Sequence, residues 1–262
     1  IYIDLLIGVS YIHFIVEFEG CQVNKRLFWL HNTTPHFWHK GEELSLEIME
    51  RLDEYILLSN WHAEDFDRRY SLEKPFHIIS NGIDLSKVNK ADKENTMLYT
   101  SHPERGLHKV LKKKLFKKLD CELKVSSPMY GVDLLNSLSG GFTPMGSLSL
   151  SDLYKEMAKA KYWHYPTDYE ETFCITALEM LAHGVTPVLN DPKAALEETL
   201  AGFYITESQA EKGSVIDAEK AFEYVKTKDW SEIAKKWVTL LNDRKPNLHT
   251  YIISLQANNE LI

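Results

Sequence analysis

The 262-residue chain has few cysteines and no long hydrophobic run. Its three cysteines, Cys21, Cys121 and Cys174, are odd in number and widely spaced, which indicates neither a disulfide framework nor a zinc site. We therefore expect a reducing compartment, the cytoplasm. The most apolar run, Leu5 to Val16, has about twelve residues, is interrupted by His13, and is shorter than the roughly twenty residues of a membrane span. We expect it to form sheet core, so membrane contact is not indicated.

The chain also lacks an excess of basic residues, a targeting signal and internal repeats. Its formal net charge of −8 argues against nucleic-acid binding, which needs a concentrated basic face. The start has no basic n-region and no small-residue cleavage site, so we expect no signal peptide. The chain begins at Ile1, not at Met, within an expected strand, so we expect either a fragment that lacks upstream residues or a reduced first domain.

A glycine-rich phosphate loop of the dinucleotide-binding type is absent as well. Gly140, Gly141 and Gly146 do not have the spacing of G-x-G-x-x-G after a strand. A nicotinamide-dependent Rossmann enzyme is therefore not expected.

What the chain does contain is a regular alternation of short apolar runs with amphipathic segments. Its 44% apolar and 26% charged residues are ordinary for a globular protein. The alternation predicts an α/β protein with parallel sheets. The expected strands are 3–7, 27–31, 55–59, 76–80, 96–100, 122–125, 142–145, 162–165, 185–189 and 203–206. The expected helices are 43–52, 61–69, 104–119, 151–161 with Ser151 as cap, 172–184, 192–200, 217–227 and 230–242.

A polar segment divides this alternation into two parts. The Asn81-Gly82 turn is followed by residues 84–95, whose composition is that of a linker. We therefore expect two Rossmann-like domains. They are an N-terminal domain over 1–88 and a C-terminal domain over 89–243, and a tail, 244–262, can pack back on the N-terminal domain.

The most informative stretch is residues 165–184, YPTDYEETFCITALEMLAHG. A strand ends at Pro166, an acidic loop follows, and a helix is expected from Thr172 or Phe173 to Gly184. Glu171 would lie at the mouth of that helix, with Glu179 about 12 Å further along the axis. The free N–H groups of the first turn lie between them, at the positive end of the helix dipole. Such a site suits a ligand with a central anion and hydroxyl groups at both ends, as in a sugar–diphosphate–ribose.

Two glutamates eight residues apart also occur in helices that have no site. Glutamate is a common helix former, and Glu171 can simply favour the helix dipole. The context argues for a site, because the strand–loop–helix unit runs into a further strand, 185–189. Such βαβ connectivity places helix N-termini at the carboxyl edge of a parallel sheet, where open α/β folds bind ligands.

The same stretch resembles the E-x7-E motif of retaining glycosyltransferases of the GT-B fold, family 4 type. Residues 171–179, ETFCITALE, follow a form of this motif that some members carry. Three further segments are similar to family motifs and extend the resemblance over roughly residues 25–240. They are NGID at 81–84, before the interdomain linker, SHPERGL at 101–107, a phosphate segment, and LEET at 196–199.

The resemblance implies a GT-B architecture, with two Rossmann-like domains facing a cleft and the N-terminal one incomplete. It also implies roles for particular residues. Glu179 would bind the donor ribose, Glu171 would face the transferred sugar, and Arg105 would neutralise the departing diphosphate. His31, after a strand of the N-terminal domain, would lie against the donor sugar. The other implied donor-binding residues are Ser101, Lys109, Phe173, Cys174, Ile175 and Thr176, the last four through backbone N–H groups.

By this resemblance the chain is expected to be a glycosyltransferase (EC 2.4 type). It would move a sugar from a UDP- or GDP-sugar to an acceptor hydroxyl in glycan, polysaccharide or glycolipid assembly, with retention and without a bound cofactor. His31, His36 and His39 have a spacing that fits a metal, but no carboxylate or cysteine joins them, so no metal is expected. Family members have a longer N-terminal domain. The alternative is therefore a nucleotide-sugar-binding module without full catalytic competence.

Overall fold

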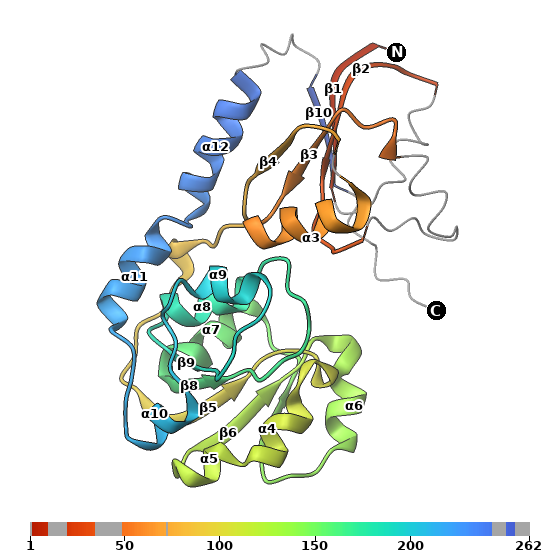
Figure 1. The fold of residues 1–262 in the computed structure, drawn as a ribbon. Helices are drawn as coiled ribbons and strands as arrows, with labels where there is room; N and C mark the ends of the chain where they lie inside the picture. Colours follow the sequence, from red (N-terminus) through yellow and green to blue (C-terminus); the bar gives the residue numbers. More distant parts are fainter. Residues whose placement is uncertain (1, 10–19, 35–48, 72, 243–249, 255–262) are drawn as a thin grey trace. The chain divides into compact units, whose positions relative to one another are not determined.

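The computed structural model describes residues 2–9, 20–34, 49–71, 73–242 and 250–254 (Figure 1). Its contacts divide the chain into two compact units. The first comprises Ile1–Asn81 with Ile233–Ile262, and the second is Gly82–Glu232. The first division lies at 81/82 and not at the expected 88/89. The second lies at 232/233 and not at the expected 243/244, because Ile233 and Leu240 pack into the core of the first unit.

The first unit is a parallel sheet of five strands in the order β10-β1-β2-β3-β4. Its strands are β1 (Tyr2–Val9), β2 (Gln22–Trp29), β3 (Glu54–Leu57), β4 (Phe76–Ile78) and β10 (Thr250–Ser254). Its helices are α3 (Asn60–Tyr70), which Ser59 caps, and the larger part of α12 (Trp230–Asn242). The expected helix 43–52 lies largely outside the described residues.

Residues of β1 enter two different hydrophobic clusters of the first unit. Leu6 packs with Phe66 of α3 in one cluster. Leu5 and Ile7 pack with Ile233 of α12 in the other. Helices therefore cover both faces of this sheet, which is why its strands read as continuous apolar runs.

The second unit is also a five-stranded parallel sheet, in the order β7-β6-β5-β8-β9. Its strands are β5 (Glu94–Tyr99), β6 (Glu122–Ser126), β7 (Thr143–Gly146), β8 (Ala160–His164) and β9 (Thr186–Val188). Its helices are α4 (Leu107–Lys113), α5 (Leu115–Lys118), α6 (Val132–Ser137), α7 (Leu150–Lys159), α8 (Ile175–Ala182), α9 (Ala195–Leu200), α10 (Glu207–Glu211) and α11 (Ala218–Lys226), with short 3-10 turns η1 (Leu85–Lys87), η2 (Pro103–Arg105) and η3 (Met129–Gly131).

Several helices differ in extent from their sequence-based expectation. The expected helix 104–119 is broken into η2, α4 and α5. Gly106 (φ 132°) separates η2 from α4, and Lys114, in a left-handed conformation (φ 53°), separates α4 from α5. Helix α7 is capped by Ser149, not by Ser151, and the Ser149 side chain accepts a hydrogen bond from Asp152 N. Helix α9 starts at Ala195, three residues later than expected. The expected strand 203–206 is reduced to one bridge between Val188 and Ile205. Helices α6 and α10 were not anticipated.

Helix α8 begins at Ile175, later than the expected Thr172 or Phe173. The preceding segment is held in successive tight turns. Thr167 N donates to Tyr165 O, Tyr169 N to Thr167 Oγ1, and Glu171 N to Tyr169 O. These local bonds satisfy backbone groups without a helical turn, so the acidic segment remains a loop.

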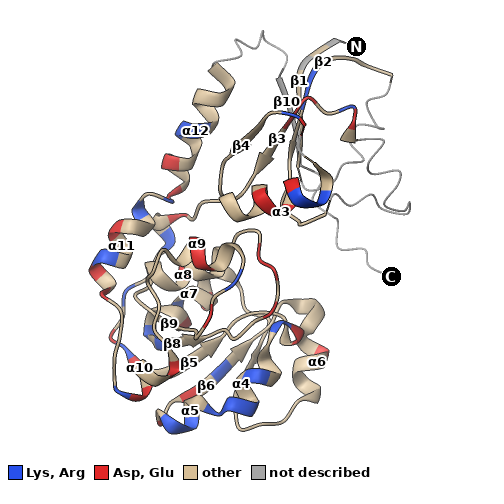
Figure 2. Cartoon of the chain, in the orientation of Figure 1, with Lys and Arg blue, Asp and Glu red and all other residues tan. Residues whose placement is uncertain are grey.

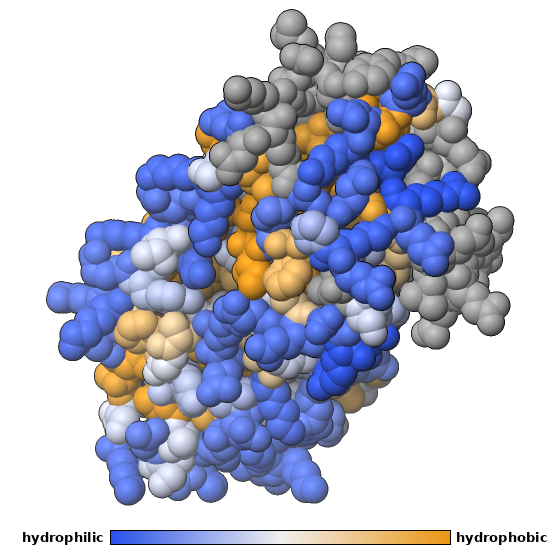
Figure 3. Space-filling view, turned by 45° about the horizontal axis from the view of Figure 1, so that its top comes forward, coloured by the Kyte–Doolittle hydropathy of each residue, from blue (hydrophilic) through white to orange (hydrophobic). Residues whose placement is uncertain are grey.

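Among the helices that the structure describes, none is both long and apolar enough to cross a lipid bilayer. Polar side chains cover most of the described surface on the face drawn in Figure 3.

Candidate active site

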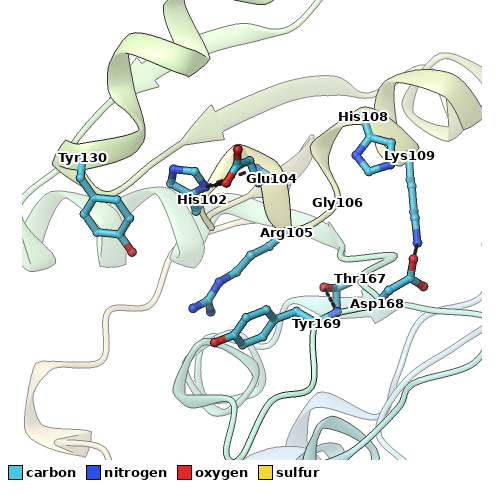
Figure 4. A pocket seen from close by; sticks show the side chains of 10 residues that line it. All are labelled: His102, Glu104, Arg105, Gly106, His108, Lys109, Tyr130, Thr167, Asp168 and Tyr169. Carbon is cyan, nitrogen blue, oxygen red and sulfur yellow. Dashed lines mark hydrogen bonds and ion pairs between the residues drawn. The ribbon is translucent and has the colours of Figure 1, made fainter. Parts of the chain in front are cut away.

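A pocket of about 460 Å³ opens in the second unit, beyond the carboxyl ends of the neighbouring strands β5 and β8 (Figure 4). This is the edge of a parallel sheet at which open α/β folds bind ligands. The segment after β5 supplies one wall and the loop after β8 supplies another. The lining residues are His102, Glu104, Arg105, Gly106, His108, Lys109, Tyr130, Thr167, Asp168 and Tyr169.

Arg105 projects between these two segments. Its guanidinium lies 4.0 Å from the centre of the Tyr169 ring (Figure 4). Its Nη1 is 3.3 Å from Glu171 Oε1. Burial by itself would lower the pKa of Arg105, but Glu171 and the surrounding tyrosines outweigh it and raise that pKa above its ordinary value. Arg105 is therefore a permanent cation, held by a stacking contact and an ion pair.

Gly106 allows the segment after β5 to come this close to the loop after β8. Its φ is +132°, and a Cβ at this position would lie 3.0 Å from Pro166 O. Residues with a side chain rarely adopt such a φ. The glycine of the RGL segment therefore sets the distance between Arg105 and the acidic loop.

Glu171 is buried, with 8% of its surface exposed. Its Oε1 accepts a hydrogen bond of 2.8 Å from Tyr165 Oη and faces Arg105 on the same oxygen. Its backbone oxygen accepts from Ala195 N at 3.1 Å, which ties the acidic loop to α9. Burial raises the pKa of Glu171, against the opposing effects of Arg105 and the Tyr165 hydroxyl.

Glu179 has a similar environment inside α8. It is 9% exposed, and its Oε1 accepts a hydrogen bond of 2.8 Å from Tyr154 Oη. Burial raises the pKa of Glu179, and the bond from Tyr154 opposes this effect. Each carboxylate of the pair is thus held by one buried tyrosine.

The N-terminal end of α8, called its mouth below, lies between Glu171 and Glu179 in the sequence. The N-cap residue is Cys174, and no side chain caps the first turn. Burial, with Glu171 nearby, raises the pKa of Cys174 well above its usual range, so the thiol stays neutral. Ile175 is 40% exposed whereas Phe173 and Cys174 are buried, so the first turn is reached from the Ile175 and Thr176 side. None of these residues, and neither glutamate, lines the pocket itself.

Two further expected donor-binding residues lie on the same side of the sheet. Ser101 Oγ is 3.5 Å from Tyr165 Oη, so it lies next to the Glu171 contact. Lys109, on α4, forms an ion pair with Asp168 at the pocket wall (Figure 4). A phosphate at Lys109 would therefore have to compete with Asp168.

The other lysines of α4 and α5 form a basic band (Figure 2). Lys113 pairs with Glu207 and Lys118 pairs with Glu211, both on α10. These pairs belong to a solvated face.

His31 belongs to the first unit, where it follows β2. Its ring centre is 4.6 Å from that of Trp29, and its side chain is hydrogen-bonded to that of Asn81. Burial lowers the pKa of His31 to about 4, although the bond to Asn81 opposes the shift. The imidazole is therefore neutral at pH 7. His36 and His39 lie outside the described residues, and the described residues contain no group of three metal-ligating side chains.

Sequence reasoning missed the aromatic residues around the site. Tyr154 contacts Glu179, Tyr165 contacts Glu171, and Tyr169 contacts Arg105. The two tyrosines of YPTDYEE could have indicated part of this arrangement from the sequence. Tyr130 is 74% exposed and stacks on His102, with ring centres 5.2 Å apart and planes at 15°.

Neither a protein family nor a curated protein matches this sequence. Solved structures do match the fold. The pneumococcal O-GlcNAc transferase GtfA in complex with UDP and GlcNAc aligns with a TM-score of 0.63 and 13% identity, over 88% of this chain and 54% of that one. Sucrose-phosphate synthase from Thermosynechococcus elongatus aligns with a TM-score of 0.70 and 14% identity, over 91% of this chain and 73% of that one.

The Anabaena protein HepE in complex with UDP aligns with a TM-score of 0.64 and 14% identity, over 92% of this chain and 79% of that one. This chain thus spans about half the length of GtfA. At such identities the likeness concerns the fold, and it confirms the expected α/β architecture. The chain has the GT-B fold of these glycosyltransferases, with a parallel Rossmann-like sheet in each of its two units.

Proposed function

We propose that this chain is a glycosyltransferase that binds a nucleotide-diphosphate sugar through its second unit and transfers the sugar, with retention of configuration, to an acceptor hydroxyl. The observation that carries the proposal is the 3.3 Å contact between Arg105 Nη1 and Glu171 Oε1. It joins a cation suited to a diphosphate to the first carboxylate of the E-x7-E pair. The two residues come from segments that follow neighbouring parallel strands.

The diphosphate would bind between Arg105 and the mouth of α8. A guanidinium can bind two phosphate oxygens at once, and the uncapped first turn offers N–H groups at the positive end of a helix dipole. Both groups stabilise charge that develops on the diphosphate as the glycosidic bond breaks. Glu179, about one turn further along α8, would accept hydrogen bonds from the ribose hydroxyls.

The sugar would lie beside Glu171. Glycosyl transfer passes through a transition state with positive charge at the anomeric carbon, which a nearby carboxylate stabilises. We assign this carboxylate, whose Oε1 is held by Tyr165 and Arg105, an electrostatic role and not that of a nucleophile. The departing phosphate would accept the proton of the acceptor hydroxyl as that hydroxyl attacks from the same face.

The stacked pair of Tyr130 and His102 is a suitable platform for the nucleobase. A flat, exposed ring at a pocket wall stacks on any base without selecting among bases. GtfA and HepE have been crystallised with UDP, so UDP and its sugars are the first ligands to test.

His31 keeps its candidate role on chemical grounds. A neutral imidazole can donate one hydrogen bond and accept another, and the bond to Asn81 fixes the orientation of the ring. We expect His31→Ala to lower turnover more than it weakens binding of the nucleoside diphosphate.

The first experiment is a binding titration of the purified chain with UDP, GDP and their sugars, by calorimetry and thermal shift. A ligand that binds the native state raises the melting temperature with its concentration. We expect a nucleoside diphosphate to do so, and we expect Glu179→Ala to weaken the effect. Lys118→Ala, on the face that pairs with α10, is the matched control and should behave as the wild type. A chain that binds no nucleoside diphosphate contradicts the proposal.

A second candidate function is a nucleotide-sugar-binding module without transferase activity. The observation that favours it is the length of the chain, which spans 54% of GtfA. Incubation with the donor sugar alone separates the two functions. Slow hydrolysis of the donor supports the enzyme, whereas tight binding with no release of sugar supports the module.

A further inference from the structure

The contact between Tyr165 and Glu171 goes beyond the E-x7-E pattern, because Tyr165 lies outside that motif. Tyr165 is 1% exposed and its Oη donates to Glu171 Oε1 at 2.8 Å. The same oxygen is 3.3 Å from Arg105 Nη1. Among the described residues no hydrogen bond reaches Oε2. One oxygen of the carboxylate is thus fully engaged, and the other is left for a ligand.

The position of the Tyr165 hydroxyl is rigid. Its ring stacks on Trp163, with ring centres 5.0 Å apart and planes at 18°, and lies 6.0 Å from the ring of Tyr99. Its backbone oxygen accepts from Thr167 N at 2.9 Å, at the start of the acidic loop. Because both the ring and the backbone of Tyr165 are held, its hydroxyl has a fixed position and can orient the Glu171 carboxylate.

The hydroxyl also favours the charged form of Glu171. Burial raises the pKa of Glu171, and the two groups that oppose this effect are Arg105 and Tyr165. Burial likewise raises the pKa of the Tyr165 phenol far above its usual range, so the hydroxyl stays protonated near neutral pH and can donate a hydrogen bond. The other ionisable groups coupled to Glu171 are Tyr99 and Cys174, and both are neutral near pH 7.

We propose that Tyr165 is a positioning residue, which holds Glu171 as an anion with Oε1 engaged and Oε2 available to the donor sugar. This inference rests on the proposed function for the identity of the ligand. Arg105 alone cannot fill the role, because it is also needed by the diphosphate. When a diphosphate binds Arg105, the hydrogen bond from Tyr165 remains and keeps the Glu171 carboxylate charged and oriented.

The test is Tyr165→Phe in the full chain, with Tyr162→Phe as the matched control. Tyr162 is also buried on β8, and the structure gives its hydroxyl no contact with the site. A hydrogen bond to a charged group, when lost, corresponds to about a tenfold to hundredfold change in rate. We expect Tyr165→Phe to lower kcat by this factor and to leave KM for the donor nearly unchanged. We also expect the acid limb of the pH–rate profile to move to higher pH, because the pKa of Glu171 rises when a donor to its charged form is removed.

A second readout does not depend on activity. Carbon-13 NMR of glutamate-labelled protein follows the ionisation of the Glu171 carboxyl, with Glu171→Gln to assign its resonance. Tyr165→Phe should raise the titration midpoint, and Tyr162→Phe should leave it unchanged. An unchanged midpoint in Tyr165→Phe overturns the inference, as does an equal loss of kcat at every pH.

The two failures are distinguishable. If the wild-type chain neither binds a nucleoside diphosphate nor hydrolyses a donor, the proposed function fails, while the NMR titration still decides the role of Tyr165. If the wild type does both and Tyr165→Phe matches it in pH profile and midpoint, the role of Tyr165 alone fails.

Discussion

The guanidinium of Arg105 lies over the ring of Tyr169, 4.0 Å from its centre. This contact holds a cation at the pocket wall, next to a carboxylate, in a segment of only three helical residues. An arginine in so short a turn would otherwise be free to move in solvent. The stacking contact therefore places the charge where a diphosphate would need it.

Arg105→Ala should mainly lower turnover. Removing one group that stabilises charge in a transition state typically costs about a hundredfold or more in kcat. The measurement is the steady-state rate of donor hydrolysis or transfer over a range of donor concentrations.

Arg105→Lys is the matched control for this variant. Lysine keeps the charge but loses the planar fork and the stack on Tyr169, so we expect a rate between those of the wild type and the alanine variant. If Arg105→Ala retains wild-type turnover, Arg105 has no role in stabilising the leaving group.

Glu179→Ala should mainly weaken donor binding. The ribose would lose the carboxylate that accepts its hydroxyl hydrogen bonds, and bonds of this kind contribute about 1.5–3 kcal/mol each. We expect KM and the dissociation constant of the nucleoside diphosphate to rise about tenfold or more, with a smaller effect on kcat.

Tyr154→Phe should act in the same direction and more weakly, since it only releases Oε1 of Glu179. Calorimetry on the two variants makes the comparison. Equal affinity of Glu179→Ala and the wild type for the nucleoside diphosphate would exclude a ribose contact.

Gly106→Ala should destabilise the fold as well as the site. The alanine would have to adopt a φ of +132°, and its Cβ would lie 3.0 Å from Pro166 O. Strained backbone of this kind costs about 1–3 kcal/mol, and the contact with Pro166 adds to it. The measurement is the free energy of unfolding from urea denaturation.

Gly202→Ala separates strain from contact. Gly202 also has a positive φ, of +83°, but a Cβ there would meet nothing within 4 Å. We expect this variant to lose about 1 kcal/mol and to keep its affinity for a nucleoside diphosphate. If both variants lose the same stability, the close approach to Pro166 is not what requires Gly106.

Glu207 should make stability depend on pH in the acid range. A hydrogen bond with His164, together with Lys113, lowers the pKa of Glu207 from 4.5 to about 2 in the folded protein. A lowered carboxyl pKa contributes stability above pH 4.5, and this contribution is lost as the pH falls toward 2.

The test is Glu207→Gln, with urea unfolding at pH 7, 5 and 3. The difference in free energy of unfolding from the wild type should be largest at pH 7 and 5 and smaller at pH 3. Glu211→Gln is the control, because the pair of Glu211 with Lys118 is exposed and contributes little at any pH. A difference that does not change with pH would show that Glu207 acts through packing and not through its charge.

Much of the fold and of the candidate site was predictable because the signals are local. Apolar runs of four to eight residues, each followed by an amphipathic segment, predicted both parallel sheets. The E-x7-E stretch is a single loop and helix, so the sequence places Glu179 inside a helix and Glu171 before it, although the helix starts later than expected, at Ile175. The cap at Ser149 and the break at Lys114 were not predictable, because neighbouring residues offered equally good caps and the break depends on how α5 packs.

The sequence by itself determined the α/β class, the alternation of strands and helices in both units, and the positions of Glu171 before α8 and Glu179 within it, since each of these follows from residue patterns within a few turns of chain. Only the tertiary structure decided which groups meet those carboxylates. Tyr154 lies 25 residues before Glu179, and Arg105 lies 66 residues before Glu171. Contacts of that kind depend on which strands become neighbours in the sheet, and local patterns carry no information about it. The division of the chain was decided in the same way, because α12 follows the second unit in sequence but buries Ile233 and Leu240 in the core of the first.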